Sequence, residues 1–313
     1  MKNFMKYLRF AGLLIAGLCW AGPSAAASSA GAEPFNFLFL DTGARAVGMG
    51  GAYAALATDA NALAYNPAGL GRIISRQATF MHNQHFESIT QEYLSFADPR
   101  GWGMSLNYLN FGDVPKTTIS NPAGIGLGSA GMKDLGLSVG YGHPLSKSLS
   151  VGAGVKLIKE SIDDISVSAF AADLGILYYV PVVQKLTLGF AIQNLGPEVK
   201  FQGAEENLPL TMRAGAAYGF TILGRESAAA ADIVKERSES ALLNLGVETH
   251  IAKTVPVRLG FNTRNDAGTG ISAGLGWIHS SFNFDYAIVS YGDLGITHRL
   301  GLTYTWGRSG GTL

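Results

Sequence analysis

The sequence predicts an all-β protein: a transmembrane antiparallel β-barrel of about 14 strands, with an N-terminal hatch segment inside the lumen. Three observations support this prediction. An export signal opens the chain, and charged residues make up only 15% of it, against roughly 25% in ordinary soluble domains. Downstream, about fourteen short segments alternate between apolar residues and small or polar ones. Such strands allow an exported, apolar chain to turn its hydrophobic face toward lipid.

Residues 1–27 are predicted to be a secretory signal peptide. Basic residues come first, an apolar run over residues 10–20 follows, and the small residues 25–27 offer a cleavage site. The apolar run is too short to span a bilayer as a helix. Its removal takes away Cys19, the only cysteine, and so excludes a disulfide or a thiolate metal site. A cut after Ala30 and a lipid anchor on Cys19 are the alternatives.

Residues 28–76 are predicted to form the N-terminal hatch, or plug. Small residues allow close packing here, and the proline after Asn66 suits the start of a short helix. The glycines of residues 48–51 do not form a phosphate loop, because no Lys-Ser or Lys-Thr follows and Tyr53 replaces the third glycine of the dinucleotide fingerprint. Close backbone approach explains them better. The residues of the hatch motif are Gly43, Arg45, Gly48, Gly50, Gly51, Asp59, Asn66, Pro67 and Gly69.

Residues 77–306 are predicted to form the transmembrane β-barrel. Within 151–157, for example, apolar side chains alternate with glycine or lysine, which gives the strand one apolar face and one small or polar face. The predicted strands are 77–85, 90–97, 102–110, 134–142, 149–160, 167–180, 186–194, 209–220, 228–236, 240–251, 254–264, 269–279, 282–291 and 296–306. Their even number is typical of bacterial outer-membrane barrels. A soluble β-sandwich would also alternate, but would carry more charge on its solvent faces.

The lengths of the connections agree with this topology. If both termini are periplasmic, the two longest connections, 111–133 and 195–208, fall on the outer side, where long loops are expected. The segment 111–133 could fold inward, cover the mouth or contact a partner. The last strand ends on Trp306, an aromatic residue of the kind found at barrel rims, and residues 307–313 form a C-terminal tail.

Two N-terminal motifs, over residues 43–53 and 66–70, resemble the signature of the PorV/PorQ family, a branch of the FadL-like outer-membrane proteins. The C-terminal runs 285–287 and 292–299 are similar to the ending of that family. The resemblance implies a barrel of about fourteen strands with an internal hatch. In FadL-like proteins the hatch gates hydrophobic molecules such as fatty acids, which leave sideways through the wall. PorV-like members instead serve the type IX secretion system and carry exported cargo to the cell surface.

Charged residues on the inward faces of the strands are the best candidates for a functional site. Burying an unpaired charge is costly, so these residues are expected to pair with one another, with the hatch or with water. The expected hatch partners are Asp41, Arg45 and Asp59. The network could simply hold the hatch, or its rupture could open a path. The predicted lumen charges are Lys156, Asp173, Arg213, Glu248, Arg258, Asp285 and Arg299.

The leading functional prediction is the binding or passage of small hydrophobic compounds across the bacterial outer membrane. Phe35, Phe37 and Phe39 are predicted apolar ligand contacts. The alternatives are a PorV-like accessory protein of type IX secretion, which binds exported cargo, and a purely structural barrel. The expected partners are outer-membrane lipid, a hydrophobic small molecule or secreted cargo protein, and the barrel-assembly machinery.

The sequence predicts neither catalysis nor a cofactor. The histidines are scattered, and His82 and His85 would point to opposite faces of one strand, which argues against a metal pair. No Ser-His-Asp order or paired carboxylates stand out, so we expect a protein that is not an enzyme and has no metal site. The net charge of +0 gives no electrostatic footprint for nucleic acid.

Overall fold

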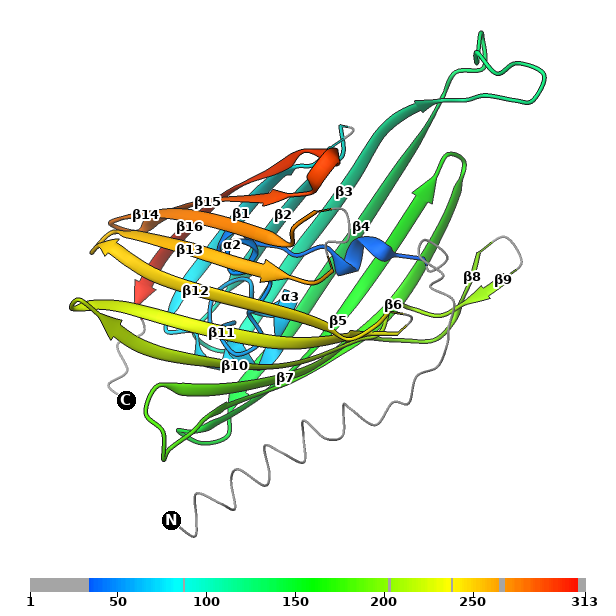
Figure 1. Cartoon of the computed structure of the whole chain (residues 1–313). Coiled ribbons are helices and arrows are strands. Elements are labelled where there is room, and N and C mark those ends of the chain that lie inside the picture. Colours follow the sequence, from blue (N-terminus) through cyan, green and yellow to red (C-terminus); the bar gives the residue numbers. More distant parts are fainter. Residues whose placement is uncertain (1–33, 87, 202–203, 238, 265–267, 309–313) are drawn as a thin grey trace.

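The computed structural model describes residues 34–86, 88–201, 204–237, 239–264 and 268–308. The expected signal peptide and most of the expected C-terminal tail lie outside these residues. The described chain forms one closed barrel of fourteen antiparallel strands, in which β1 pairs with β16 to complete the wall (Figure 1). The predicted fold class is therefore confirmed. Within the described residues, no helix is both long and apolar enough to cross a bilayer.

The wall consists of strands that follow one another in sequence around the barrel. They are β1 (Ser75–Gln84), β2 (Thr90–Ala97), β3 (Trp102–Pro115), β4 (Ser129–Pro144), β5 (Leu149–Ile162), β6 (Ile165–Tyr179), β7 (Leu186–Leu195), β10 (Thr211–Ile222), β11 (Arg225–Glu236), β12 (Leu242–Ala252), β13 (Val255–Asn262), β14 (Ile271–His279), β15 (Phe282–Ser290) and β16 (Ile296–Arg308). A small hairpin of β8 (Val199–Phe201) and β9 (Ala204–Glu206) lies between β7 and β10, and the 3-10 helix η3 (Gly292–Leu294) precedes β16.

Residues 35–72, called the hatch below, enter the lumen as four short helices joined by turns. These are the 3-10 helix η1 (Asn36–Phe39), α2 (Ala44–Gly48), α3 (Ala62–Tyr65) and the 3-10 helix η2 (Pro67–Arg72). Pro67 occupies the start of η2, and the side chain of Asn66 caps it by accepting a hydrogen bond from the amide of Ala68 at 3.1 Å. In Figure 1 the hatch is the blue chain enclosed by the strands.

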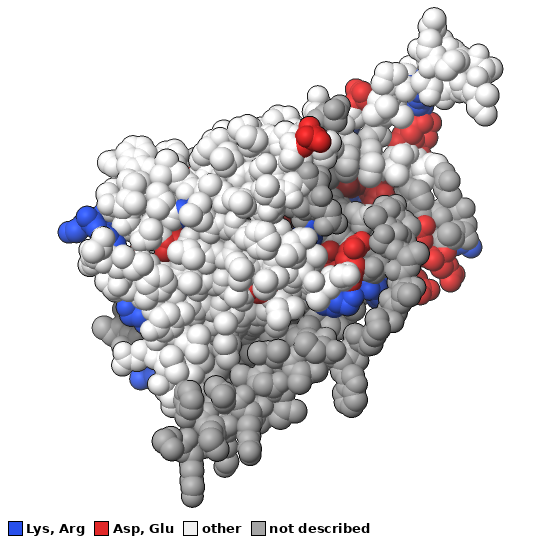
Figure 2. All heavy atoms as spheres, viewed as in Figure 1, with Lys and Arg blue, Asp and Glu red and all other residues white. Residues whose placement is uncertain are grey.

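The strands present apolar side chains outward and small or charged ones inward, the reverse of a soluble barrel. On β5, Val155 and Leu157 are 63% and 40% exposed, whereas Lys156 between them is only 9% exposed. This alternation is typical of strands whose outer face contacts lipid. Figure 2 agrees, because the visible wall between the two ends of the barrel carries almost no charged residues.

The two ends of the barrel differ. The end with the short turns 98–101, 145–148 and 223–224 is called the inner rim below, and the opposite end is the outer rim. Near the inner rim, aromatic rings on neighbouring strands are in contact: the centroids of Trp102 and Tyr141 lie 4.8 Å apart, and those of Phe282 and Tyr304 4.9 Å apart. Aromatic girdles of this kind mark the membrane interface of barrels.

Two of the expected long connections are partly ordered as strands. β3 and β4 extend beyond the predicted segments 102–110 and 134–142, because a register shift between Asn110 and Asp113 lets the ladder continue to Pro115. The resulting hairpin rises well above the outer rim (Figure 1). The second connection contains the β8–β9 hairpin, which the sequence pattern did not predict because each strand has only three residues.

Candidate functional site

The hatch packs closely against several glycine-rich patches of the wall. On β12 and β13, Gly246 and Gly260 lie opposite each other in the ladder and face Met49 and Gly50. A Cβ added at Gly260 would lie 2.1 Å from the backbone nitrogen of Gly50, and one added at Gly246 would lie 2.4 Å from the carbonyl oxygen of Met49. The backbones of hatch and wall therefore approach more closely than any side chain at these wall positions would permit.

A second patch lies on β5 and β6 and receives the start of η2. A Cβ at Gly152 would lie 2.3 Å from the carbonyl carbon of Pro67, and one at Gly175 would lie 2.1 Å from the side-chain oxygen of Asn66. The Asn66 amide donates to the carbonyl oxygens of Ala54 and Ile176, each at 2.9 Å. Asn66 and Pro67 thus tie the hatch both to itself and to the wall.

The other motif glycines serve the internal turns of the hatch. Gly43, Gly50 and Gly51 have positive φ angles of 77°, 65° and 75°, which glycine adopts most readily. Gly48 faces Gly274 of the wall, and a Cβ at Gly69 would lie 1.5 Å from the carbonyl oxygen of Ala57. Each glycine of the motif therefore lies at a tight turn or a close contact.

A chain of ion pairs joins the hatch to β12, β13 and β15. Arg45 donates two hydrogen bonds to Glu248, from Nη2 to Oε1 at 2.9 Å and from Nε to Oε2 at 3.0 Å. Arg258 donates to Glu248 Oε2 and to Asp285 Oδ1, each at 2.6 Å. Asp59 of the hatch accepts a hydrogen bond from Tyr53 and lies 3.5 Å from Arg45 Nη1. Charge-assisted, two-pronged pairs of this kind are among the stronger polar contacts in proteins.

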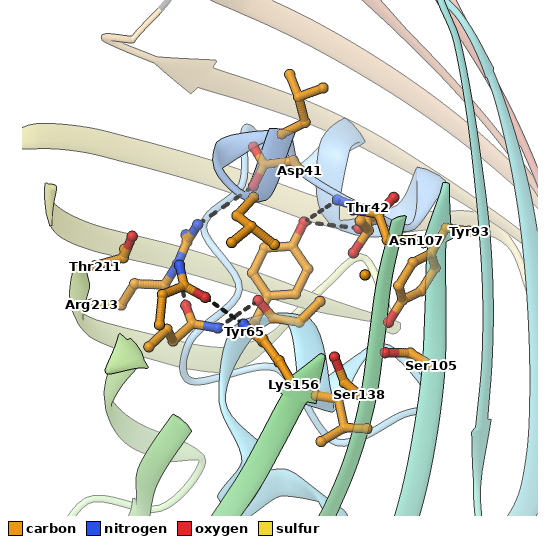
Figure 3. Close-up of a pocket in the computed structure, with 17 residues that line it drawn as sticks. Asp41, Thr42, Tyr65, Tyr93, Ser105, Asn107, Ser138, Lys156, Thr211 and Arg213 are labelled. Atoms are coloured by element: carbon orange, nitrogen blue, oxygen red, sulfur yellow. Dashed lines mark hydrogen bonds and ion pairs between the residues drawn. The ribbon is translucent and has the colours of Figure 1, made fainter. Parts of the chain in front are cut away.

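A second polar group lies on the side of β5, β6 and β10, around the cavity shown in Figure 3. Lys156 contacts Asp173 at 2.9 Å and donates to the side-chain oxygen of Asn194 at 2.7 Å. The guanidinium of Arg213 lies over the ring of Tyr65, 5.2 Å from its centroid, and 3.8 Å from Asp41. In Figure 3, Tyr65 lies at the centre of the view and Arg213 lies to one side of it.

Each predicted lumen charge is at least nine-tenths buried inside the barrel, but they fall into separate groups. Glu248, Arg258 and Asp285 meet Arg45, whereas Lys156 and Asp173 pair with each other. Arg213 meets Asp41. Arg299 joins none of these groups. The expected hatch partners Arg45 and Asp41 contact the wall, while Asp59 bonds within the hatch.

Asp232 on β11 also binds the hatch, and sequence reasoning missed it. One of its carboxylate oxygens accepts hydrogen bonds from the backbone amides of Tyr53 and Ala54, each at 2.8 Å. Its strand has alanine on both faces over residues 228–231, so the period-two pattern fails there. The sequence signal that could have identified Asp232 is a lone carboxylate within an alanine-rich strand, because a buried ionisable residue there needs a partner.

The three predicted phenylalanine contacts do not act together. Phe35 and Phe37 are buried in one apolar cluster with Leu109, Ile158 and other wall residues, and neither lines the two cavities described below. Phe39 lines a cavity between the hatch and β13–β16. η1 has about three residues per turn, so residues two positions apart in it do not share one face.

Two cavities lie between the hatch and the described part of the wall. The inner one, of about 50 Å³, is lined mainly by polar side chains, including Tyr65, Lys156 and Arg213 (Figure 3). The larger one, of about 160 Å³, lies toward the outer rim, where β13 and β15 end and β14 and β16 begin. With the hatch in this position, both volumes suit molecules no larger than a small aromatic compound.

His85 lies in the loop between β1 and β2, outside the barrel strands. Its ring packs against Phe86 and Tyr291, with centroid distances of 5.5 and 5.7 Å. Burial, together with the positive charge of Arg299, lowers the pKa of the His85 ring from 6.5 to about 4. His82 instead contacts Glu92 at 2.7 Å, so the two histidines do not form a pair.

Acid should therefore loosen the packing around His85. Because the folded pKa lies below the unfolded one, the unfolded chain binds more protons between about pH 4 and pH 6.5. The stability contribution is complete above about pH 6.5 and is lost as the pH falls toward 4, by up to roughly 3 kcal/mol. Thermal unfolding midpoints, compared near neutral pH and near pH 4, should differ less in His85→Leu than in the parent chain. The control His143→Leu, at an exposed site, should show the same difference in unfolding midpoint between the two pH values as the parent chain. If His85→Leu also shows that full difference, the prediction is contradicted.

Solved structures show which class of protein has this fold. The CymD monoaromatic hydrocarbon channel matches with a TM-score of 0.60 at 12% identity, over 85% of this chain and 98% of that chain. A Pseudomonas aeruginosa FadL homologue matches with a TM-score of 0.53 at 12% identity, over 85% and 98% of the two chains. The P. putida toluene transporter TodX gives 0.53 at 11% identity, over 80% and 95%. Identities this low establish the fold alone, which is that of the FadL-like β-barrels.

The chain belongs to the family described as "Uncharacterised protein family (UPF0164)", which matches residues 20–261. The UPF0164 protein of Treponema pallidum (strain Nichols) is 27% identical over 192 residues, or 56% of this chain. The chain spans about half the length of this curated relative, 47%. The expected FadL-like barrel is thus confirmed, whereas the finer resemblance to the PorV/PorQ branch stays a prediction.

Proposed function

We propose that this protein lies in the bacterial outer membrane and passes small hydrophobic compounds, with the hatch as its gate. One observation carries the proposal: a closed barrel holds inside it a separate segment, which is joined to the wall by polar contacts and close packing and by no strand of the sheet. Arg45 with Glu248, and Asp232 with two hatch amides, are such contacts. Because the hatch pairs with no strand of the wall, it can shift while the barrel stays closed. The proposal assigns the chain no catalytic step.

The cavity near the outer rim supports this role. Phe39, Val47 and Val289 give it apolar surface on both the hatch and the wall. A compound bound there touches both parts, so its binding can bias the position of the hatch. The inner cavity is polar and much smaller, so passage needs the hatch to shift rather than a channel that already exists.

Removal of the Arg45 side chain tests the gate. In Arg45→Ala, both hydrogen bonds to Glu248 are lost, so liposomes containing the variant should take up a hydrophobic fluorescent probe several-fold faster than those with the parent chain. Arg100→Ala is the matched control, because Arg100 is 77% exposed at the inner rim and contacts no hatch residue. Equal uptake by all three proteins would count against gating.

An accessory role in protein secretion is the second candidate, and the β3–β4 hairpin favours it. This hairpin stands above the outer rim and exposes apolar side chains near its tip, with Ile119 and Ile125 105% and 80% exposed. Apolar side chains in such a position suit contact with a protein. Co-purification from native membranes would separate the two roles. Bound lipid-like compounds would favour passage. A secreted protein that co-purifies with the parent chain, but not with a variant whose β3–β4 hairpin is shortened to a tight turn, would favour the PorV-like role.

A further inference from the structure

The larger cavity combines a buried positive charge with apolar walls. It lies between the hatch and strands β13–β16 at the outer rim, separate from the polar cavity of Figure 3. The residues that line it are Phe39, Leu40, Asp41, Val47, Gly50, Asn262, Arg264, Gly270, Ser272, Val289, Tyr291 and Arg299. Its volume of about 160 Å³ is close to that of an engineered apolar cavity of roughly 150 Å³ that binds benzene.

Arg299 is the unusual residue of this cavity. Arg299 is 2% exposed, and within the described residues its side chain makes one hydrogen bond, from Nη1 to the hydroxyl of Thr297 at 2.8 Å. Its Nε has no partner among the described residues, and none of their carboxylates lies within 4.0 Å of its guanidinium. The buried cations Lys156, Arg213 and Arg258 each have a carboxylate neighbour. A buried cation without a counter-charge is costly to maintain.

Two further donors without partners line the same cavity. The hydroxyl of Ser272, a residue that is 3% exposed, makes no hydrogen bond within the described part of the chain. The Nε of Arg264 likewise has no partner there, although its terminal nitrogens bind Glu236 and the carbonyl oxygen of Phe39. Buried polar groups of proteins are almost always hydrogen-bonded. Three free donors outnumber the free acceptor of this lining, Asp41 Oδ1, so they point to an acceptor from outside the chain.

The remaining lining limits what that acceptor can be. Phe39, Val47 and Val289 offer apolar surface, which favours a ligand with a compact apolar body. Asp41 also lines the cavity, 3.8 Å from Arg213, and its negative charge opposes a ligand that carries two charges. The volume excludes a long acyl chain within the closed cavity.

We infer that this cavity binds a small monocarboxylate with a compact apolar body, of about the size of benzoate. Arg299 pairs with the carboxylate, Ser272 donates a hydrogen bond to it, and the apolar body lies against Val47 and Val289. A planar guanidinium suits a carboxylate in this way, since it can donate two parallel hydrogen bonds. The inference deepens the proposed function by naming a substrate class. It rests on that function only for the claim that the bound ligand is then passed across the membrane.

Calorimetric titration of the purified full-length barrel in non-ionic detergent tests the binding directly. Benzoate should bind, while its neutral analogue benzyl alcohol and inorganic phosphate should each bind at least about tenfold more weakly, because one lacks the charge and the other the apolar body. Binding of benzyl alcohol equal to that of benzoate would overturn the role of Arg299. Binding of phosphate equal to that of benzoate would overturn the role of the apolar lining.

Variants locate the site. Arg299→Gln should weaken benzoate binding by roughly tenfold or more, and Ser272→Ala by a smaller factor. Val289→Phe fills the cavity while keeping every donor, so it should abolish binding even if Arg299→Gln does not fold. Arg100→Gln, at an exposed arginine, is the control and should bind as the parent does. Undiminished benzoate binding in folded Val289→Phe would place the ligand elsewhere and overturn the inference.

This test separates the inference from the proposed function. Benzoate binding that depends on Arg299, in a barrel that passes no compound into liposomes, supports the site and contradicts passage. Passage of neutral hydrophobic probes by a barrel that does not bind benzoate supports passage and contradicts the site.

Discussion

Replacement of Glu248 by alanine should detach one side of the hatch from the wall and cost about 3–5 kcal/mol of its stability, the penalty for breaking a buried ion pair. Glu248 is 7% exposed and binds Arg45 of the hatch and Arg258 of the wall at the same time. Its loss leaves Arg258, which is 3% exposed, with Asp285 alone, and leaves Arg45 with the more distant Asp59. No other single carboxylate in the described chain holds a cation on each side of the boundary between hatch and wall.

Hydrogen exchange followed by mass spectrometry measures this loss where it occurs. Peptides from residues 44–60 should exchange much faster in Glu248→Ala, while peptides from β3–β6 on the far side of the barrel should be unchanged. Glu248→Gln keeps an acceptor oxygen, so its hatch peptides should exchange at a rate between those of the parent chain and Glu248→Ala. Glu226→Ala removes an exposed carboxylate from β11 and serves as the control. Unchanged exchange of the hatch in Glu248→Ala would mean that the glycine contacts alone hold it.

Strand alternation determined how much of this architecture could be predicted. Because side chains on a strand point alternately to its two faces, a single lysine between Val155 and Leu157 had to face the lumen once those two faced lipid. The same argument applies to Arg258 and Asp285. It fails on β11, where alanines on both faces remove the contrast, and Asp232 was missed for that reason.

The contacts between hatch and wall could not be predicted, because the hatch has no long periodic element. The bond between Arg45 and Glu248 joins residues 203 positions apart, and only the folded turns at Gly43 and Gly50 decide which wall strand Arg45 reaches. The same is true of Arg299. Its inward direction follows from its strand, but the absence of a carboxylate partner among the described residues depends on where the other charged residues come to lie.

The addition of one methyl group at Gly260 should displace the hatch while the barrel still forms. In Gly260→Ala the new Cβ would lie 2.1 Å from the backbone nitrogen of Gly50 and 2.5 Å from the carbonyl carbon of Met49. Neither atom belongs to a flexible side chain, so the hatch must move. Overpacking of this kind costs about 1–3 kcal/mol or more when the neighbours cannot adjust. On the wall, the new Cβ would lie 2.5 Å from the hydroxyl of Ser272, which is the end of a side chain and can turn away. Alanine itself fits an antiparallel strand.

Limited proteolysis and probe uptake in liposomes together report the displacement. Gly260→Ala should become sensitive to cleavage within residues 44–60, and it should pass a hydrophobic probe several-fold faster than the parent chain. Gly154→Ala is the matched control: it also lies on the lumen face of a strand, yet its added Cβ would come no closer than 3.4 Å to any neighbour. If Gly260→Ala is cleaved in the hatch but its uptake stays at the parent level, a loosened hatch does not open a path and passage through the lumen is contradicted. If neither cleavage nor uptake changes, the close contact between Gly50 and Gly260 does not hold the hatch in place.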